Sequence, residues 1–450
     1  WIIGKGLKLQ SEPVLSVLKT EGIQVNDLTD FKAAVEARFN LWAKSKRVDY
    51  KGQDNLHALA NSGYKTGFLG GDYLVILRVE EGELNVQVID GQQVQSPIFD
   101  DAAHKEAEKK GNTIRNGIEK DSRGRHVAFY VRVEDKGSLF GKFERVAAYG
   151  ENTGRKMAWM VYFDKHRIDH DRGIGALTSI LEKIEKLDRY TEATVGSAEE
   201  RAKMVLSIEH SADSTGENPL AEKMRIAMGR GTAEETKPDS YSASEQKAKD
   251  ITRTTSKQVV NLPIGSKLVT PSSSGAEINF PEFWKAVFNC LAAAVDIPPE
   301  VALQMYNSNY SASRAAINGW QQLMDVSRDK FASDFYKPIF ERWLELEVLK
   351  SKVNAPGYLS AIKKKNVFGL EAYAHCRFTG SNMPHIDPLK EVKAIREMLG
   401  SEMDGVSLIS LEQAAEKLNS GDWLENYKKF TEEQKTIPKP NVTDKSKTGE

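Results

Sequence analysis

The stretch RAAINGWQQLMDVSRDKFASDFYKPIFERWLELEVLK, residues 314–350, decides the fold of this chain. Its large apolar side chains recur every three or four residues, which predicts one very long helix. At 1.5 Å per residue such a helix would reach roughly 50 Å. Gly319 weakens the pattern near its start, and Pro338 predicts a kink because proline cannot donate the helical hydrogen bond.

A polar stretch, Gln304 to Ser313, precedes the long helix. Upstream of it, residues 281–296 predict a shorter helix with Pro281 at its first position, stopped by Pro298 and Pro299. A further helix is predicted over 174–203, because apolar residues from Ile174 to Leu187 recur at helical spacing between charged ones. Its start is marked by Gly173 and Gly175.

Residues 204–280, between these two helices, predict a small separate domain. Residues 210–258 are rich in Ser, Thr, Glu, Lys and Gly and poor in large apolar residues, which is typical of a loop-rich insert with at most one helix near 219–228. Strand-like pieces flank this insert at 205–208, 259–262 and 267–269.

The first 173 residues predict a mixed α+β region, and the C-terminal part predicts helices. The N-terminal elements are helices over 30–47 and 54–67 and strands over 73–77, 84–89, 126–133 and 157–163. The C-terminal helices are 388–399, 411–418 and 422–435. The tail 437–450 is polar, contains two prolines, and is predicted to be disordered.

The overall charge argues against a protein that holds nucleic acid by its phosphates. The 450 residues carry 63 basic and 64 acidic side chains, a net charge of −1. A DNA-gripping protein usually has a basic excess, because Lys and Arg supply the affinity through counterion release. Two distant cysteines, Cys290 and Cys376, predict neither a disulfide framework nor a cysteine zinc site.

The sequence offers no membrane or secretion element. Apolar runs such as 291–295 are far too short to cross a bilayer. Residues 1–6 lack the basic start and apolar core of a signal peptide and are typical of an internal segment, so we expect further residues upstream.

One pair of histidines has a spacing that could bind a metal ion. His166 and His170 are four residues apart and lie beside Asp164, Asp169 and Asp171. The spacing also fits a charged turn between a strand and a helix, which we favour because Arg172-Gly173 would break a helix here. The chain has no nucleophile elbow, phosphate-binding loop or dinucleotide fingerprint, so we predict no catalytic residue, metal or cofactor.

Four segments together resemble the portal proteins of lambda-like tailed phages. They are GKGLKLQS at 4–11, DRGIGAL at 171–177, NSNYSASRAA at 307–316 and IDPLKE at 386–391, in the family's order. The third and fourth are the more specific. His385 stands where the family often has Trp, and the insert 210–258 has no match in the family pattern.

The resemblance implies a multidomain α+β portal fold that forms a ring, usually of twelve subunits, at one vertex of the capsid. By this analogy 1–173 form a wing, 174–203 and 281–296 two stem helices, and 204–280 a small α/β clip. Residues 297–313 form a tunnel loop, 314–386 a long wing helix and wing return, and 387–436 a helical crown.

The same resemblance implies the partners and the place of action. They are double-stranded DNA read without sequence preference, the large terminase subunit, the major capsid protein and scaffold, and a head-tail adaptor. The chain would act in the virion, after assembly in the host cytoplasm, and without a membrane. A nearly neutral chain suits this role, because a basic channel would retain DNA that must slide in both directions.

Two sets of residues are predicted to act in such a ring. The DNA-facing set is polar and lies in the tunnel loop: Gln304, Met305, Asn307, Ser308, Asn309 and Tyr310. The subunit-interface set lies on the long helix, which is apolar on more than one face: Trp320, Arg328, Arg342, Trp343 and Glu345.

Two alternatives stay open at this point. Another connector ring, such as an adaptor, would have the same structural role, although adaptors are usually shorter. A metal-dependent nuclease would need clustered acidic ligands in a basic setting. The only candidate cluster is Asp164, Asp169 and Asp171, and its setting is neutral.

Overall fold

The computed structural model divides the chain into two compact units. One unit comprises 1–179 and 292–450, and the other comprises 180–291. The structure describes residues 2–97, 101–133, 142–203, 207–210, 266–269, 280–305, 310–380, 388–400, 407–418, 420–421 and 423–436. Within these ranges, no helix has both the length and the apolar character that crossing a membrane requires.

The first unit is organised around strand β2 (Asp72–Glu80). It pairs on one side with β3 (Glu83–Asp90) and on the other with β8 (Ala158–Tyr162), both antiparallel. Side chains alternate between two separate cores: Tyr73 and Val75 face one, and Leu74 and Ile76 face the other. Both faces are covered, which explains why the sequence of β2 reads as one continuous apolar run.

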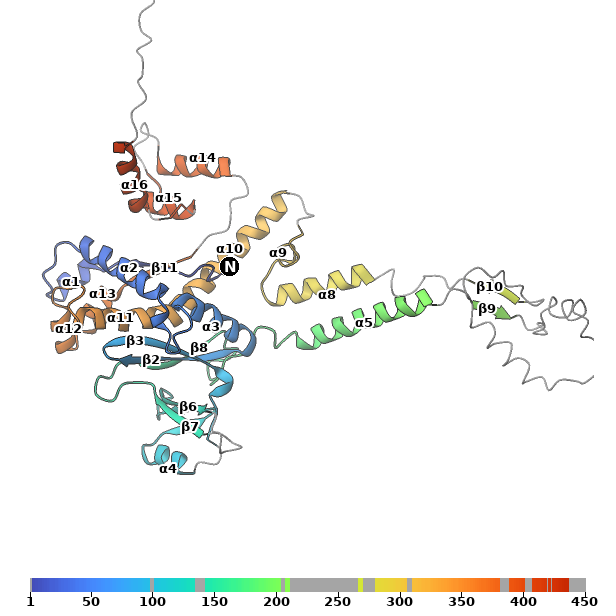
Figure 1. Cartoon of the computed structure of the whole chain (residues 1–450), viewed down its shortest axis with the longest axis horizontal. Helices are drawn as coiled ribbons and strands as arrows, with labels where there is room; N and C mark the ends of the chain where they lie inside the picture. The colour runs from blue at the N-terminus through green and yellow to red at the C-terminus, as the bar shows by residue number, and fades with distance from the viewer. Residues whose placement is uncertain are drawn as a thin grey trace, which may run out of the picture. The chain divides into compact units, whose positions relative to one another are not determined.

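Helices cover the first face of this sheet (Figure 1). They are α2 (Thr29–Lys44), α3 (Leu56–Gly70) and α11 (Lys337–Leu349). Phe39 of α2 packs edge-on against Phe340 and Trp343 of α11, with ring centroids 5.4 and 5.1 Å apart. This core therefore joins residues that are about 300 positions apart in the chain.

A four-stranded sheet covers the second face. Its order is β4 (Thr113–Arg115), β5 (Ile118–Lys120), β6 (His126–Val133) and β7 (Lys142–Ala147), and α4 (Asp101–Lys109) precedes it. Ile118 and Phe129 are fully buried against Leu74 of β2. The predicted α2, α3, β2, β3, β6 and β8 are therefore confirmed as elements of a mixed α+β fold.

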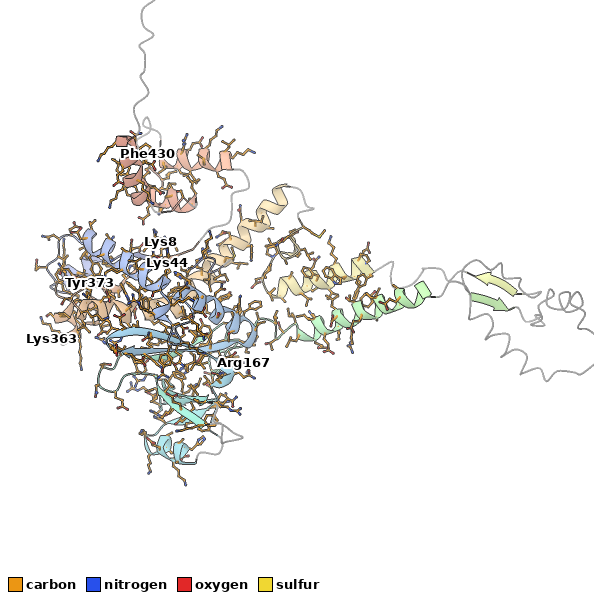
Figure 2. All side chains as sticks on the ribbon, viewed as in Figure 1. Lys8, Lys44, Arg167, Lys363, Tyr373 and Phe430 are labelled. Carbon is orange, nitrogen blue, oxygen red and sulfur yellow. The ribbon has the colours of Figure 1, made fainter. Side chains whose placement is uncertain are left out.

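The N-terminal strand and the segment after the long helix form one structure. Strand β1 (Lys8–Ser11) pairs antiparallel with β11 (Cys376–Thr379), and α1 (Leu15–Thr20) packs on α13 (Val367–Ala374). The helix α12 (Tyr358–Lys364) precedes α13. Figure 2 shows Lys363 at the end of α12 pointing outward, whereas Tyr373 of α13 is fully buried.

The predicted long helix is interrupted by a π turn. It comprises α10 (Tyr310–Phe331), a π-helical turn (Ala332–Tyr336) and α11, which has Pro338 in its first turn. Proline leaves the carbonyl four residues earlier, that of Asp334, without its helical donor. The indole Nε1 of Trp159 donates to that carbonyl at 2.8 Å, so β8 supplies the missing partner. The helix also begins at Tyr310, four residues before its predicted start.

Among its described residues, the second unit contains α5 (Leu181–Lys203), most of α8 (Phe280–Ala294) and a strand pair. The helix α5 begins seven residues later than predicted, because Ile174 instead forms a bridge with Asp164. The helix α8 agrees with its prediction. Strands β9 (Ser207–His210) and β10 (Ser266–Val269) pair antiparallel. Residues 211–258 of the predicted insert 210–258 lie outside the described residues, as do its predicted helix at 219–228 and the predicted strand 259–262.

The three predicted C-terminal helices are present as α14 (Pro388–Leu399), α15 (Leu411–Lys417) and α16 (Trp423–Thr436). The predicted disordered tail, 437–450, lies outside the described residues.

Candidate DNA-facing segment

The stretch predicted as a tunnel loop contains a short helix. The helix α9 (Pro299–Leu303) follows Pro298 directly, with Pro299 in its first turn, where a missing N–H costs nothing. The prediction of a loop throughout 297–313 is therefore wrong at both ends, since α9 occupies one end and α10 begins at Tyr310.

Two left-handed residues bend the chain on either side of α9. Asp296 has φ 55° and Gln304 has φ 54°. At the first bend the amide of Ile297 donates to the carbonyl of Ala292 at 3.0 Å, and at the second Met305 donates to Glu300 at 3.1 Å. The left-handed conformation costs a non-glycine residue about 1–2 kcal/mol. These bonds offset part of that cost and fix both turns.

Two of the six predicted DNA-facing side chains are described. Gln304 is exposed and Met305 is 56% exposed, both directly after α9. Tyr310 is the first residue of α10, but its side chain is not among those described. Asn307, Ser308 and Asn309 lie outside the described residues. Glu300 is the single charged residue in 297–313, so this segment carries almost no net field.

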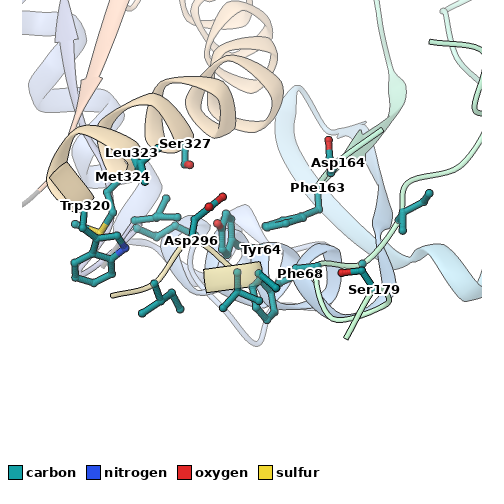
Figure 3. Close-up of a pocket in the computed structure, with 18 of the residues that line it drawn as sticks. Tyr64, Phe68, Phe163, Asp164, Ser179, Asp296, Trp320, Leu323, Met324 and Ser327 are labelled. Atoms are coloured by element: carbon teal, nitrogen blue, oxygen red, sulfur yellow. The ribbon is translucent and has the colours of Figure 1, made fainter. Parts of the chain in front are cut away.

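A hollow of about 490 Å³ adjoins the base of this segment. Its lining includes Tyr64 and Phe68 of α3, Trp320 and Met324 of α10, and Asp296 at the first bend (Figure 3). Most of its wall is apolar, and the Asp296 carboxylate points into it (Figure 3).

The chain that leads into α5 is fastened to the sheet by a buried ion pair. Arg172 donates from Nε and Nη2 to the two carboxylate oxygens of Asp72, at 2.7 Å each, and from Nη1 to the carbonyl of Val94 at 2.8 Å. The amide of Gly173 donates to Asp72 Oδ2 at 2.8 Å. Asp72 is 2% exposed, so this bidentate pair is largely removed from water.

Glycine is required where this segment crosses the end of α3. A Cβ at position 173 would lie 2.0 Å from the carbonyl oxygen of Gly71, and one at position 175 would lie 2.2 Å from that of Leu69. Both obstacles are backbone atoms and cannot rotate away. The two glycines that seemed to mark a helix start therefore allow two backbones to touch.

Three of the predicted interface residues are buried within the protomer. Trp320 is 8% exposed and lines the hollow, and Trp343 is 3% exposed against Trp42 of α2. Arg328 is 5% exposed, and it donates to the carbonyl of Ile2 at 3.1 Å and to Asp325 at 2.8 Å. These side chains hold α10 and α11 to the rest of their own chain.

Arg342 and Glu345 form an ion pair with each other at 2.8 Å, and Glu345 also pairs with Arg155 at 2.9 Å. Glu345 is 8% exposed, so little of this network reaches the surface. Sequence periodicity identified these residues as one face of the helix. It could not show that α2 and the turn at Arg155 cover this face within the same chain. A direct role for the five residues in a subunit contact stays a prediction, and their burial favours an indirect role.

Sequence reasoning overlooked an apolar face in the second unit. Tyr190 of α5 packs against Phe280 and Phe283 of α8, with ring centroids 5.6 and 4.5 Å apart, and Trp284 stacks on Phe288. No described side chain of α5 is fully buried, and Phe283 is 46% exposed. The helical spacing of Phe280, Trp284 and Phe288 was the available signal.

The histidine pair lies in an exposed turn. His166 Nε2 is 3.5 Å from Asp164, and both side chains are more than half exposed. Asp171 instead pairs with Lys120 and with Arg115. Among the described residues, no three histidine, cysteine or acidic side chains gather closely enough to hold one metal ion.

A family model described as "Phage portal protein, lambda family" matches residues 1–328. The chain belongs to this family. The match includes strands β2 and β8 and the segment around α9, and it confirms the family resemblance that the sequence segments suggested. No curated protein sequence matches the chain.

Solved structures similar to this portal-family chain come from gene transfer agent (GTA) particles. A chain from the neck of a native particle computed with C12 symmetry is 12% identical, with 92% of this chain and 96% of that chain covered and a TM-score of 0.41. A chain from the virion of a native particle is 14% identical, with 90% and 95% covered and a TM-score of 0.39.

Proposed function

We propose that this chain assembles into a ring, expected to contain twelve copies, that serves as the portal at the unique capsid vertex. Double-stranded DNA passes through the ring during packaging and ejection. The ring nucleates procapsid assembly with the major capsid protein and scaffold, receives the large terminase subunit, and later receives the head-tail adaptor. Membership of the lambda portal family carries this proposal.

The α5–α8 pair supports assembly into a ring. It presents apolar side chains, among them Leu181 at 57%, Val195 at 52% and Phe283 at 46% exposed, without a core of its own. Full burial of one large apolar side chain is worth about 1.5–3 kcal/mol. A head-to-tail contact repeated by rotation would bury such side chains at every subunit boundary and close the ring.

The near-neutral segment around α9 supports a conduit. Each phosphate contact made by Lys or Arg adds affinity that a moving duplex must break. A segment with Gln304 and Met305 exposed and Glu300 as its one charge meets DNA without retaining it. We place the chain in the virion, after assembly in the host cytoplasm, with no catalytic residue of its own.

Negative-stain microscopy of the purified chain tests assembly. We expect rings of about a dozen subunits with a central hole, in keeping with closed rotational symmetry. Phe283→Asp should prevent ring formation, whereas Lys285→Ala, at an exposed position of the same helix, should leave it intact. Wild-type protein that stays monomeric at assembly concentrations would contradict the proposal.

A charge substitution tests the conduit separately. Gln304→Lys adds one positive charge per subunit, so in a dodecamer packaging should slow and DNA ejection should become incomplete at low salt. Gln304→Asn is the matched control and should package normally. Packaging and ejection by the Lys variant at the wild-type rate at low salt would place the DNA contact elsewhere.

A further inference from the structure

A second, smaller cavity lies within the wing, beside the hollow of Figure 3. Its volume is about 230 Å³, and it shares Tyr64, Phe163 and Asp296 with that hollow. Its other walls come from β2, β8, α10 and the π turn, all parts of one compact unit. The proposed ring does not require this cavity.

One buried polar group at the cavity lacks a partner. Tyr73 lines the cavity and is 1% exposed, and among the described residues its hydroxyl makes no hydrogen bond. Its ring is pressed against α3, where a Cβ at Gly63 would lie 2.9 Å from it. An unsatisfied buried hydroxyl costs roughly as much as a lost hydrogen bond, which is why native structures normally supply a partner from the protein or from ordered water. A ligand's ammonium group can donate the same hydrogen bond.

Carboxylates outnumber ammonium groups around the same space. Asp164, Asp296 and Asp334 line the cavity, against Lys330 as the one basic lining residue among those described. Lys330 Nζ already donates to the carbonyl of Phe163 at 2.6 Å. Asp334 is partly buried, which raises the pKa of its carboxyl, and a cation bound beside it would favour the ionised form.

Aromatic faces complete the lining. Tyr64 packs edge-on against Phe163 and Phe331, with ring centroids 5.7 and 5.3 Å apart. Aromatic rings beside carboxylates are the setting in which proteins bind organic ammonium ions, because the ring face attracts the positive charge. The rings also offer an apolar surface to a hydrocarbon chain.

We propose that this cavity and the adjoining hollow bind a small aliphatic diamine or polyamine. One ammonium group would pair with Asp334 and contact the Tyr73 hydroxyl. The methylene chain would lie along Tyr64 and Phe331, and a second ammonium group would reach Asp296 at the base of α9.

The spacing of the acids favours a polyamine over a metal ion. A divalent metal needs several oxygen ligands at once at about 2.0–2.6 Å. In the described chain, no three acidic, histidine or cysteine side chains gather closely enough to provide them. A polyamine instead carries separated charges on a flexible chain, and it matches carboxylates that lie apart along an aromatic wall.

Thermal unfolding and titration calorimetry of the full chain with spermidine test the site. We expect saturable stabilisation by spermidine and no equal effect from Mg²⁺ at the same ionic strength. Asp334→Asn should weaken spermidine binding about tenfold, as expected for the loss of one charge-assisted contact. Asp329→Asn, at an exposed position of α10 away from the cavity, should bind like the wild type.

Tyr73→Phe separates binding from folding. The variant keeps the ring but removes the unpartnered hydroxyl, so its unfolding temperature without ligand should equal or exceed that of the wild type, while its response to spermidine falls. Equal stabilisation by Mg²⁺ or by neutral 1,6-hexanediol would overturn the proposal, as would spermidine binding that survives both Asp334→Asn and Tyr73→Phe. The site lies within one protomer, so these results do not depend on ring assembly.

Discussion

Replacing Asp72 by Asn should strongly destabilise the first unit, because it removes one partner of a buried ion pair. The carboxylate of Asp72 receives two hydrogen bonds from Arg172 and one from the amide of Gly173, all at 2.7–2.8 Å. An amide of the same shape keeps one acceptor oxygen. Its NH₂ group then faces N–H donors, and Arg172 loses its counter-charge.

The magnitude follows from burial. Removing one partner of a buried ion pair costs about 3–5 kcal/mol, because the other charge stays buried and unpaired. Asp72 is 2% exposed, but the Arg172 side chain is 27% exposed and keeps its bond to the carbonyl of Val94. Water therefore reaches part of the guanidinium, and we expect a loss of about 3 kcal/mol.

Urea unfolding monitored by tryptophan fluorescence measures this loss. Glu83→Gln is the control, since the Glu83–Lys350 pair at 3.1 Å joins side chains 57% and 28% exposed. An exposed pair of this kind contributes about 0–1 kcal/mol. Hydrogen exchange should locate the effect, because the amides of Gly173 and Ala176 lose protection first if the pair fastens this segment.

A loss no greater than that of Glu83→Gln would refute the reasoning. It would mean that the backbone contacts at Gly173 and Gly175, and not the ion pair, hold the chain in place. In that case Gly173→Ala should be the damaging change, since its Cβ would lie 2.0 Å from the Gly71 carbonyl oxygen.

Three further predictions follow from other buried groups. Trp159→Phe should cost at least 1–3 kcal/mol in urea unfolding, because the Asp334 carbonyl that Pro338 leaves free loses its donor. A thiol reagent should modify one cysteine per folded chain, the exposed Cys290. Cys376 should react only after denaturation, because burial raises the pKa of its thiol to about 12. Asp334→Asn, without ligand, should raise the urea midpoint at pH 7. Burial raises the folded-state pKa of this carboxyl above its ordinary 3.8, although the charges of Lys330 and Lys156 oppose that shift. The gain should therefore vanish below pH 3.8, where the carboxyl is protonated in both the folded and the unfolded state.

Local patterns were sufficient to predict most elements of the fold. The strand β6 and the helices α8, α14 and α16 were predicted within one or two residues, and α2 within three, because each has regular spacing and a clear boundary residue. The predictions fail where contacts with residues far away in the sequence determine the local structure. The partner of the Asp334 carbonyl is Trp159, 175 positions away, and no local pattern reveals it.

The candidate site was less predictable for the same reason. The stretch 304–310 was identified by its polarity, and α9 was missed because five residues give too short a periodic pattern. The five interface residues were predicted because the long helix has apolar and charged side chains on more than one face. Burial of Trp343 by Trp42, and of Glu345 by Arg155, depends on tertiary contacts that periodicity does not contain.

The two chain segments that connect the first unit to α5 and α8 are held very differently. The segment before α5 is fastened by the bidentate Arg172–Asp72 pair and by glycine contacts between backbones. The segment after α8 is held by backbone hydrogen bonds within residues 292–305. It contains two residues in the left-handed conformation and adjoins the largely apolar hollow. If DNA passes through the ring as proposed, a force on the chain would therefore meet fewer fixed contacts at α9 than at the start of α5. A ligand that ties Asp296 to Asp334 would stiffen the second of these connections, which links the proposed polyamine site to the segment proposed to face DNA.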